Sequence, residues 1–161
     1  MSDKRNDDNF IALYNRYADT VYRVCYTYLR NVADAEDAMQ NVFMKLLVKP
    51  ECFKDADHEK AWLMRVATNC CKDALKSPRT QCFSLEDVPE PAALDTKHDE
   101  TLEEVLKLSE NQRICVYLHY YEGYNTMEIA DIINRPHSTV RNYLSEARAQ
   151  LRKRLAGGFD E

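Results

Sequence analysis

The segment MEIADIINRPHSTVRNYLSEARAQLRKRL, residues 127–155, decides how the C-terminal part of the chain folds. It holds two helical patterns that are interrupted between Asn134 and Pro136. Asparagine tolerates the left-handed conformation of a tight turn, and proline pushes the preceding Arg135 out of the helical region. Proline also suits the first turn of a new helix. The segment therefore predicts a helix, a short turn and a second helix.

The second of these predicted helices divides its side chains between two faces. The apolar face comprises Val140, Leu144, Ala147, Leu151 and Leu155, and another face carries Arg141, Ser145, Arg148 and Arg152. This pattern is typical of DNA-binding bihelical motifs, in which residues at the helix start meet base edges and arginines further along meet phosphates. A solvated amphipathic helix with an arginine face is the alternative. The residues that we predict to bind duplex DNA are Arg135, His137, Ser138, Thr139, Arg141, Asn142, Ser145, Arg148 and Arg152.

The composition is typical of a folded, helix-rich protein of one domain or two small ones. The chain has 161 residues, of which 45% are hydrophobic, 30% are charged and only three are glycine. Its formal net charge is −5, so DNA binding has to come from a local basic surface rather than from the overall charge. The N-terminus is polar and no apolar run approaches about 18 residues, which predicts a cytoplasmic protein without membrane insertion.

Six cysteines occur along the chain without a C-x-x-C pair, and no histidine lies at ligand spacing from a pair of cysteines. This spacing argues against a zinc site, and a reducing cytosol argues against disulfides. We expect free thiols, with Cys25, Cys70 and Cys115 as small core residues. A redox role for Cys70 or Cys71 stays open. No metal and no cofactor are predicted.

Helical patterns fill the chain on both sides of one irregular segment. Three helices are expected before it, over about residues 10–29, 31–47 and 58–76. Asn31 is expected to cap the second of them, and Leu47 is expected on its buried face. Between residues 78 and 100, prolines and a run of acids predict a flexible acidic linker.

Helix signals return after this linker. Capping boxes are expected at Thr101–Glu104, Ser109–Gln112 and Asn125–Glu128, and Gly123 is expected to end a helix. No alternating strand pattern occurs in the sequence. The prediction is therefore an all-α fold of two small helical domains joined by the linker.

The helix expected near residues 58–76 carries a second set of side chains suited to nucleic acid. Trp62, Arg65, Asn69, Lys72 and Lys76 follow one another at steps of three or four residues, which places them along one face. An aromatic ring, an amide and three cations suit unpaired bases next to a charged backbone. The alternative for Trp62 is a partly buried core residue.

A resemblance to a known family rests on two separate motifs. DAEDAMQNVFMKLL (residues 34–47), followed by AWLMRVATNCCKDALK (61–76), resembles region two of bacterial sigma factors. The segment that begins LSENQRICVYLHYYEGY and runs to Leu155 resembles their region four. The order of the motifs, the linker between them and the small size are similar to the extracytoplasmic-function (ECF) group of the sigma-70 family. The resemblance covers the chain from Phe10 to Leu155.

The resemblance implies a factor that binds core RNA polymerase and directs promoter-specific transcription initiation. Residues 1–77 would bind polymerase and open the −10 element, 78–100 would be the linker, and 101–161 would read the −35 element. The polymerase contacts would be the β′ clamp helices and the β flap, and an anti-sigma factor is a further expected partner. The residues implied to contact the clamp helices are Asp34, Asp37, Gln40, Asn41 and Lys45. Those implied to contact the single-stranded −10 element are Phe53, Lys54, Lys60, Trp62, Arg65, Asn69, Lys72 and Lys76, with Phe53, Lys54 and Asn69 forming a pocket for a flipped base.

Two other classes of function remain as alternatives. A helix-turn-helix regulator that acts without core polymerase would explain the C-terminal segment but not the motifs at residues 34–47 and 61–76. An enzyme is disfavoured, because the sequence holds no Gly-rich phosphate loop, no metal cluster and no convincing nucleophile–base pair. Co-purification with core polymerase separates the sigma factor from the regulator.

Overall fold

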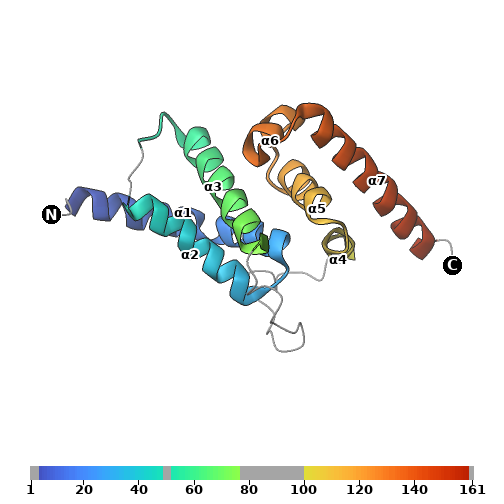
Figure 1. The fold of residues 1–161 in the computed structure, drawn as a ribbon, viewed down its shortest axis with the longest axis horizontal. Helices are drawn as coiled ribbons and strands as arrows, with labels where there is room; N and C mark the ends of the chain where they lie inside the picture. Colours follow the sequence, from blue (N-terminus) through green and yellow to red (C-terminus); the bar gives the residue numbers. More distant parts are fainter. Residues whose placement is uncertain (1–3, 49–51, 77–99, 160–161) are drawn as a thin grey trace. The chain divides into compact units, whose positions relative to one another are not determined.

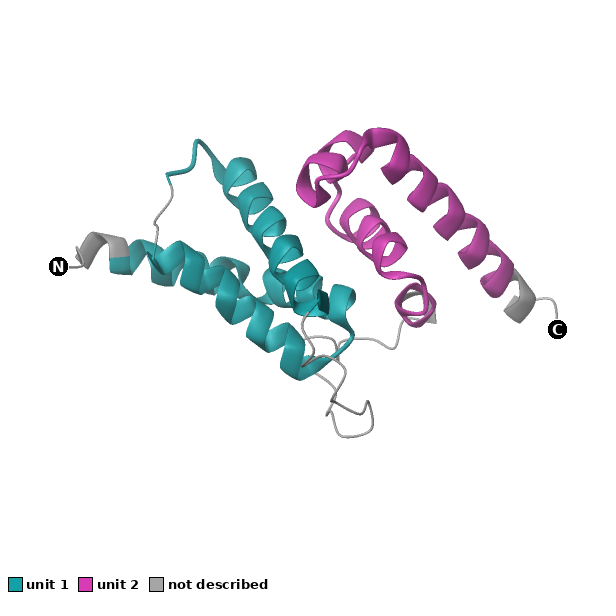
Figure 2. Cartoon of the chain, viewed as in Figure 1, with its two compact units in different colours: residues 1–93 teal, residues 94–161 magenta. Residues whose placement is uncertain are grey.

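The computed structural model describes residues 4–48, 52–76 and 100–159, and all of its regular elements are helices (Figure 1). They form two compact units, residues 1–93 and 94–161 (Figure 2). The predicted all-α fold is thus confirmed. The predicted linker, residues 78–100, lies outside the described residues except for Glu100, at which a helix begins. Cys82 also lies outside the described residues.

Three long helices pack against one another in the first unit. They are α1 (Lys4–Leu29), α2 (Val32–Val48) and α3 (Ala56–Lys76). Arg30 adopts a left-handed conformation (φ 58°), which lets the chain reverse between α1 and α2 within two residues. The Asn31 side chain then accepts a hydrogen bond of 2.9 Å from the Asp34 backbone N–H, which confirms the predicted cap. The fully buried apolar side chains of this core, among the described residues, are Val21, Val24, Cys25, Ala35, Val42, Leu63, Met64, Ala67 and Cys71.

The buried face of α2 is narrower than the sequence predicts. Val42, Phe43 and Leu46 are buried, and the Phe43 ring packs edge-on against Tyr14 of α1 at 4.9 Å between ring centroids. Leu47, which we expected in the core, is 48% exposed. One residue further along a helix turns the side chain by about 100°, so Leu47 leaves the face that Leu46 buries.

The described residues of the second unit, 100–159, form five helical elements. They are α4 (Glu100–Leu106), α5 (Glu110–Val116), the π-helix η4 (Tyr117–Tyr121), α6 (Thr126–Ile133) and α7 (His137–Phe159). The long helix α7 packs against α4, α5 and α6. After η4, Gly123 has a φ of +78°, which confirms that this glycine ends the helical run in a left-handed conformation. The buried apolar residues include Ile114, Leu118, Ile129, Ile132, Val140, Leu144 and Ala147.

Of the three predicted capping boxes, the one at the start of α6 is confirmed. The Asn125 side chain accepts a 2.8 Å hydrogen bond from the Glu128 N–H, and the Glu128 carboxylate accepts one of 3.0 Å from the Asn125 N–H. Ser109 occupies the N-cap position of α5, but its hydroxyl makes no capping bond. Its expected partner, Gln112, is buried and donates to Glu146 of α7 instead, at 3.1 Å. A tertiary contact has replaced the local one.

The capping box at Thr101 is also wrong. Helix α4 begins at Glu100, so Thr101 lies inside the helix rather than before it. Glu104, the expected partner, binds Lys107 at 3.1 Å and Arg154 of α7 at 3.8 Å. The Glu104 carboxylate, which the sequence spacing predicts to cap a helix start, therefore helps to join α4 to the C-terminal half of α7.

The two N-cap residues Asn125 and Ser109 offer a matched pair of variants. Asn125→Ala is expected to lower the free energy of unfolding by about 1 kcal/mol, because it removes a side chain that satisfies the Glu128 N–H. Ser109→Ala is expected to change it by less than about 0.5 kcal/mol, since the Ser109 side chain caps nothing. Urea unfolding followed by circular dichroism measures both. Equal effects of the two variants would contradict the capping assignment.

Four of the five cysteines in the described part of the chain are core residues. Cys25, Cys70, Cys71 and Cys115 are buried free thiols, and Cys52 is exposed. Burial raises the pKa of Cys70, and raises that of Cys115 to about 12. A hydrogen bond with Cys25, together with burial, raises the pKa of Cys71 well above its ordinary value. These thiols stay protonated near neutral pH, which lowers their reactivity.

Two further properties concern the described part of the chain only. No helix within it is both long and apolar enough to cross a membrane. Among the same residues, no three histidine, cysteine or acidic side chains gather closely enough to hold a metal ion.

Candidate nucleic-acid interface

The turn between α6 and α7 has the geometry that the sequence predicts. Asn134 ends α6 in the left-handed conformation, with φ 55° and ψ 54°. The next N–H, that of Arg135, donates to the Ala130 carbonyl at 3.1 Å and closes the end of α6. Helix α7 starts directly after Pro136. Two helices and a short turn are therefore held in a fixed bihelical arrangement.

The start of α7 is tied to the start of α6 by a side-chain contact. His137 Nε2 and Thr126 Oγ1 share a hydrogen bond of 2.6 Å, and both side chains are half-buried. The His137 ring, which the sequence places at the DNA-facing start of α7, thus also makes a contact within the protein. Ser138 and Asn142 are exposed, and Thr139 is half-buried.

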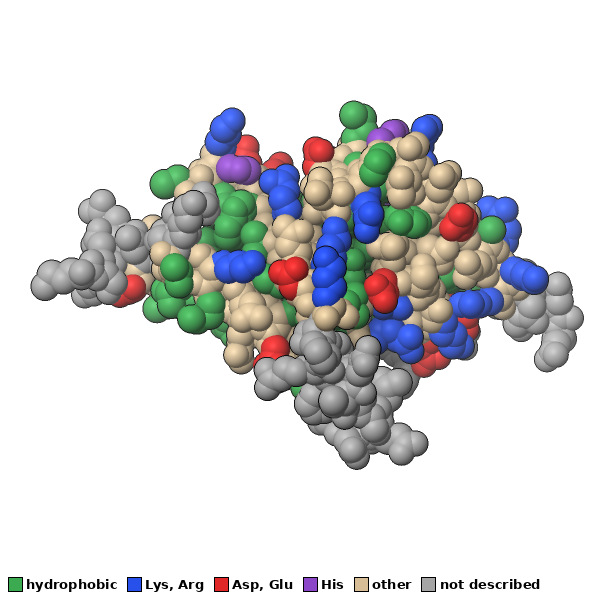
Figure 3. Space-filling model, viewed as in Figure 1, with side chains coloured by type: hydrophobic (Ala, Val, Ile, Leu, Met, Phe, Trp, Pro, Cys, Tyr) green, Lys and Arg blue, Asp and Glu red, His purple; other side chains and the backbone are tan. Residues whose placement is uncertain are grey.

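The two faces of α7 are separated as predicted. Val140, Leu144 and Ala147 are buried, and Leu151 and Leu155 continue the same stripe half-buried. The polar face is exposed at Arg141, Ser145, Arg148 and Arg152, and Arg135 in the turn is exposed too. Lys and Arg side chains gather over α7 in Figure 3. An exposed, positively charged helix that follows a short turn is suited to the major groove of DNA.

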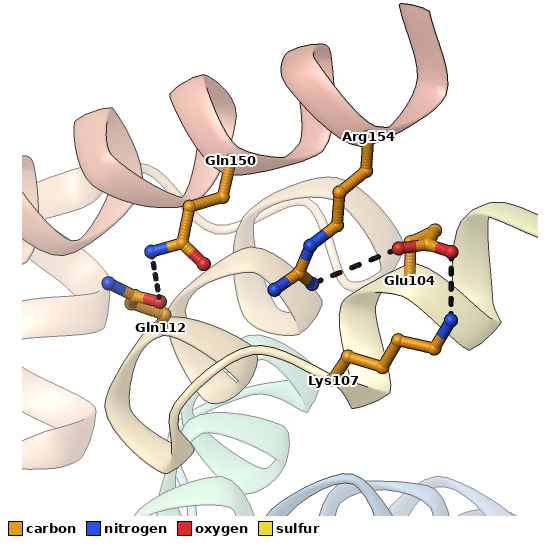
Figure 4. A network of polar contacts seen from close by, with 5 residues as sticks. All are labelled: Glu104, Lys107, Gln112, Gln150 and Arg154. Carbon is orange, nitrogen blue, oxygen red and sulfur yellow. Dashed lines mark hydrogen bonds and ion pairs between the residues drawn. The ribbon is translucent and has the colours of Figure 1, made fainter. Parts of the chain in front are cut away.

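Polar contacts hold the opposite side of α7 against α4 and α5 (Figure 4). Gln112 accepts a hydrogen bond from Gln150 at 3.4 Å, and Arg154 lies 3.8 Å from the Glu104 carboxylate. Lys107 pairs with the other oxygen of the same carboxylate at 3.1 Å. The two ion pairs at Glu104 are solvent-accessible and individually weak, whereas Gln112 is buried. Together these contacts anchor the side of α7 that does not carry the arginine face.

One contact of the arginine face was not predicted. Arg148 Nε donates a hydrogen bond of 2.7 Å to the hydroxyl oxygen of Tyr120, which belongs to η4. The Arg148 guanidinium carbon also lies 5.8 Å from the centre of the Tyr120 ring. The two residues are 28 positions apart, so neither periodicity nor local motif spacing could have paired them.

In the first unit, the loop before α3 and the start of α3 form a small aromatic cluster. The Phe53 ring packs edge-on against Trp62 at 5.6 Å and against His58 at 5.5 Å between centroids. The Asp55 side chain caps α3 by accepting from the His58 N–H at 2.8 Å. His58 Nδ1 in turn accepts from the Lys54 N–H at 3.1 Å. The loop residues Phe53 and Lys54 are thus fixed relative to α3.

The residues predicted along one face of α3 differ in exposure. Arg65, Asn69 and Lys76 are exposed, as is Lys54 in the loop. Lys60, Trp62 and Lys72 are half-buried, and Trp62 combines its contact with the Phe53 ring with partial exposure. The exposed amide and cations near a partly exposed aromatic cluster are compatible with binding of unpaired bases.

The candidate polymerase-binding residues lie on α2. Asp37, Gln40, Asn41 and Lys45 are exposed, as expected. Asp34, in the first turn of α2, is half-buried rather than exposed.

Comparison with known proteins gives family matches in both units. A model of sigma-70 region 2 matches residues 13–80, and a model of sigma-70 region 4 matches residues 98–151. The ECF RNA polymerase sigma factor SigW of Bacillus subtilis (strain 168) is 28% identical over 94% of this chain and 91% of its own length. SigM of the same organism is 26% identical over 92% of this chain and 96% of its own length.

Two solved structures share the fold. The sigma factor RpoE from Bartonella quintana, in complex with the anti-sigma factor NepR, superposes with a TM-score of 0.73 at 20% identity, over 92% of this chain and 97% of that chain. CnrH, in complex with the cytosolic domain of CnrY, gives a TM-score of 0.65 at 20% identity, over 96% of this chain and 91% of that chain. With region 2 and region 4 matched in order over most of its length, the chain belongs to the ECF group of the sigma-70 family, whose members direct transcription initiation.

Proposed function

We propose that the second unit reads the −35 element as duplex DNA through α7. The observation that carries this proposal is the exposed face of Arg141, Ser145, Arg148 and Arg152 on a helix that follows a short, well-formed turn. Ser138, Thr139 and Asn142 at the start of α7 would meet base edges, and the arginines would meet phosphates. His137 would act indirectly, by holding α7 to α6.

The first unit would bind unpaired bases of the −10 element. Phe53 and Lys54 are held next to α3 by the aromatic cluster and the Asp55 cap, and Asn69 is exposed on α3. A flipped base needs a stacking partner and a hydrogen-bonding group. The aromatic cluster provides the first and the Asn69 amide the second. Lys60, Arg65, Lys72 and Lys76 would line the path of the strand backbone.

The polymerase would be contacted by α2, which places Asp37, Gln40, Asn41 and Lys45 at the surface. We assign these residues, together with Asp34, to the β′ clamp helices, and we assign a contact with the β flap to the second unit. The corresponding boundaries are residues 1–77 for the polymerase and −10 functions and 101–161 for the −35 function. Because the sigma factor RpoE, which has a similar fold, was solved in complex with the anti-sigma factor NepR, we also propose an anti-sigma partner.

Run-off transcription with purified core RNA polymerase tests the proposal. Addition of the chain is expected to give transcripts from a subset of templates on which core polymerase alone gives none. The chain is also expected to co-purify with core polymerase. A helix-turn-helix regulator would bind DNA yet fail in both measurements, and that pair of results would overturn the proposal in favour of the regulator.

The role of Arg148 as a phosphate contact has its own test. Arg148→Ala is expected to weaken binding of duplex DNA to a similar extent for all sequences, because phosphates carry no base information. The slope of log K against log salt concentration should fall by about 0.9, the value for the loss of one phosphate contact. Titration of labelled duplexes at several salt concentrations measures both quantities. A loss of affinity confined to one base position would contradict this role.

A further inference from the structure

The hydroxyl of Tyr120 and the guanidinium of Arg148 form a pair that crosses from η4 to α7. Their hydrogen bond of 2.7 Å is the stronger of their two contacts, since the distance of 5.8 Å from the ring centre is close to the outer limit of about 6 Å for a cation–π interaction. Both side chains are at the surface, and Tyr120 is 56% exposed. An exposed pair of this kind contributes little to the stability of the fold, so its position needs another explanation.

Tyr120 is itself held in place from the other side. The His119 ring packs edge-on against the Tyr120 ring at 4.7 Å between centroids. His119 Nδ1 donates to the Tyr124 carbonyl at 2.8 Å, which fixes the orientation of the imidazole. A backbone carbonyl, an imidazole, a phenol and a guanidinium are thus connected in sequence. This chain of contacts restricts the rotamers of Arg148, a side chain that is otherwise among the most mobile.

The π-helix contributes to the direction of Tyr120. Within η4, Tyr121 stacks on Tyr117 at 5.5 Å and 15° between ring planes, while Tyr120 contacts His119 and α7. A π-turn inserts one extra residue into a helical run and so rotates the side chains that follow it. The adjacent tyrosines therefore make different contacts: Tyr120 contacts α7, and Tyr121 stacks within η4.

The chemistry of the pair suits one phosphate group. The bond with Tyr120 uses the Nε–H of Arg148, while a guanidinium carries further N–H donors on its two terminal nitrogens. Tyr120 accepts in this bond, so its own O–H proton can be donated elsewhere. A phosphodiester has oxygen acceptors for both groups and a negative charge that matches the guanidinium. Arg148 also lies on the same face of α7 as Arg141 and Arg152.

We propose that Tyr120 and Arg148 together form a phosphodiester-binding pair, in which Tyr120 positions the guanidinium and donates a second hydrogen bond to the same phosphate. This inference rests on the proposed binding of duplex DNA by the second unit, and it extends that surface from α7 onto η4. Since Arg148 is already ordered, less side-chain entropy is lost when DNA binds. Tyr120 is a positioning residue as well as a contact.

The test is a double-mutant cycle on the full chain, with fluorescence anisotropy of a labelled 30-bp duplex of mixed sequence, about the length of three helical turns. A phosphate contact is independent of sequence, so no promoter has to be known. Tyr120→Phe keeps the ring but removes the hydroxyl, and is expected to weaken binding about three- to tenfold. In an Arg148→Ala background the same change is expected to have a clearly smaller effect, because the positioning role of Tyr120 is then gone and only its own hydrogen bond to the phosphate is lost.

Two controls make the outcome specific. Tyr121→Phe alters the neighbouring exposed tyrosine, whose ring stacks on Tyr117, and is expected to leave the affinity unchanged. The slope of log K against log salt should stay the same in Tyr120→Phe, where the cation is retained, and fall in Arg148→Ala. Thermal unfolding by circular dichroism checks that each variant is folded.

Three results would overturn the pairing. The first is that Tyr120→Phe binds DNA with wild-type affinity. The second is that Tyr120→Phe binds more tightly, which would mean that Tyr120 keeps Arg148 away from DNA. The third is that Tyr120→Phe lowers the affinity by the same factor whether or not Arg148 is present. If Arg148→Ala weakens binding while Tyr120→Phe does not, this inference alone fails. If the wild-type chain does not bind duplex DNA, the proposed reading of duplex DNA fails as well.

Discussion

Leu144→Ala is expected to lower the stability of the second unit by about 2–5 kcal/mol and to leave the first unit unchanged. Leu144 is 1% exposed and lies on the buried stripe of α7, which packs against α4, α5 and α6. Its truncation removes apolar contacts and leaves a cavity that the surrounding helices fill only in part. A loss of this size is a large fraction of the stability of a small helical domain.

The position of the single tryptophan lets the two units be followed separately. Trp62 belongs to α3, so its fluorescence reports on the first unit, whereas circular dichroism reports on the helices of both. In Leu144→Ala, part of the circular dichroism signal should be lost at a lower urea concentration than in the wild-type protein. The urea midpoint of the Trp62 fluorescence transition should stay the same. Ser145→Ala, the exposed neighbour, is the control and should shift neither signal by more than about 0.5 kcal/mol. A Trp62 transition that moves together with the helix signal would show that the units unfold as one.

Local chemistry was enough to predict the features that are decided within a few residues. The left-handed Asn134, the cap at Asn31 and the capping box at Asn125 all depend on contacts between residues at most four or five positions apart. The separation of α7 into a buried and an exposed face follows from helical periodicity in the same way. These features fix the bihelical motif, and with it the position of most candidate DNA-binding residues.

Two of the errors, at the expected capping boxes of Ser109 and Thr101, involve residues that make a tertiary contact instead of a local one. Gln112 has the right spacing for a capping box with Ser109, but Glu146 and Gln150 of α7 offer it partners 34 and 38 residues away. Glu104 has the right spacing for a capping box with Thr101, but its carboxylate pairs with Arg154 of α7. Periodicity cannot anticipate such pairs, because they depend on which helices become neighbours.

The same limit applies to the candidate site. The periodicity of α7 correctly predicted that Arg148 is exposed, but it could not show that Tyr120 holds its side chain. For His137, likewise, helical spacing predicts a place at the start of α7 but not the hydrogen bond between its ring and Thr126, 11 residues earlier. A sequence therefore predicts the face on which a residue lies more readily than the partner that orients it.

Asn69→Ala is expected to reduce formation of the open promoter complex by about tenfold, which corresponds to the loss of one hydrogen bond to a captured base. The exposed Asn69 amide can both donate and accept a hydrogen bond, and it lies about two turns along α3 from Trp62, which belongs to the aromatic cluster. Since unpairing a base costs a few kcal/mol, each contact that the flipped base makes contributes directly to the opening equilibrium. Duplex binding by α7 does not involve Asn69 and should be unaffected.

Permanganate reactivity of unpaired thymines measures this opening, with holoenzyme on a template that the wild-type protein transcribes. Asn15→Ala is the matched control, because it makes the same chemical change at an exposed position on α1. The Asn69→Ala defect should shrink on a template that is mismatched across the −10 element, where the unpairing energy no longer has to be supplied by the protein. Normal reactivity in Asn69→Ala, or an equal defect in Asn15→Ala, would remove Asn69 from the base-binding pocket. A defect that persists in full on the mismatched template would instead assign Asn69 to polymerase binding, since that step precedes strand separation on either template.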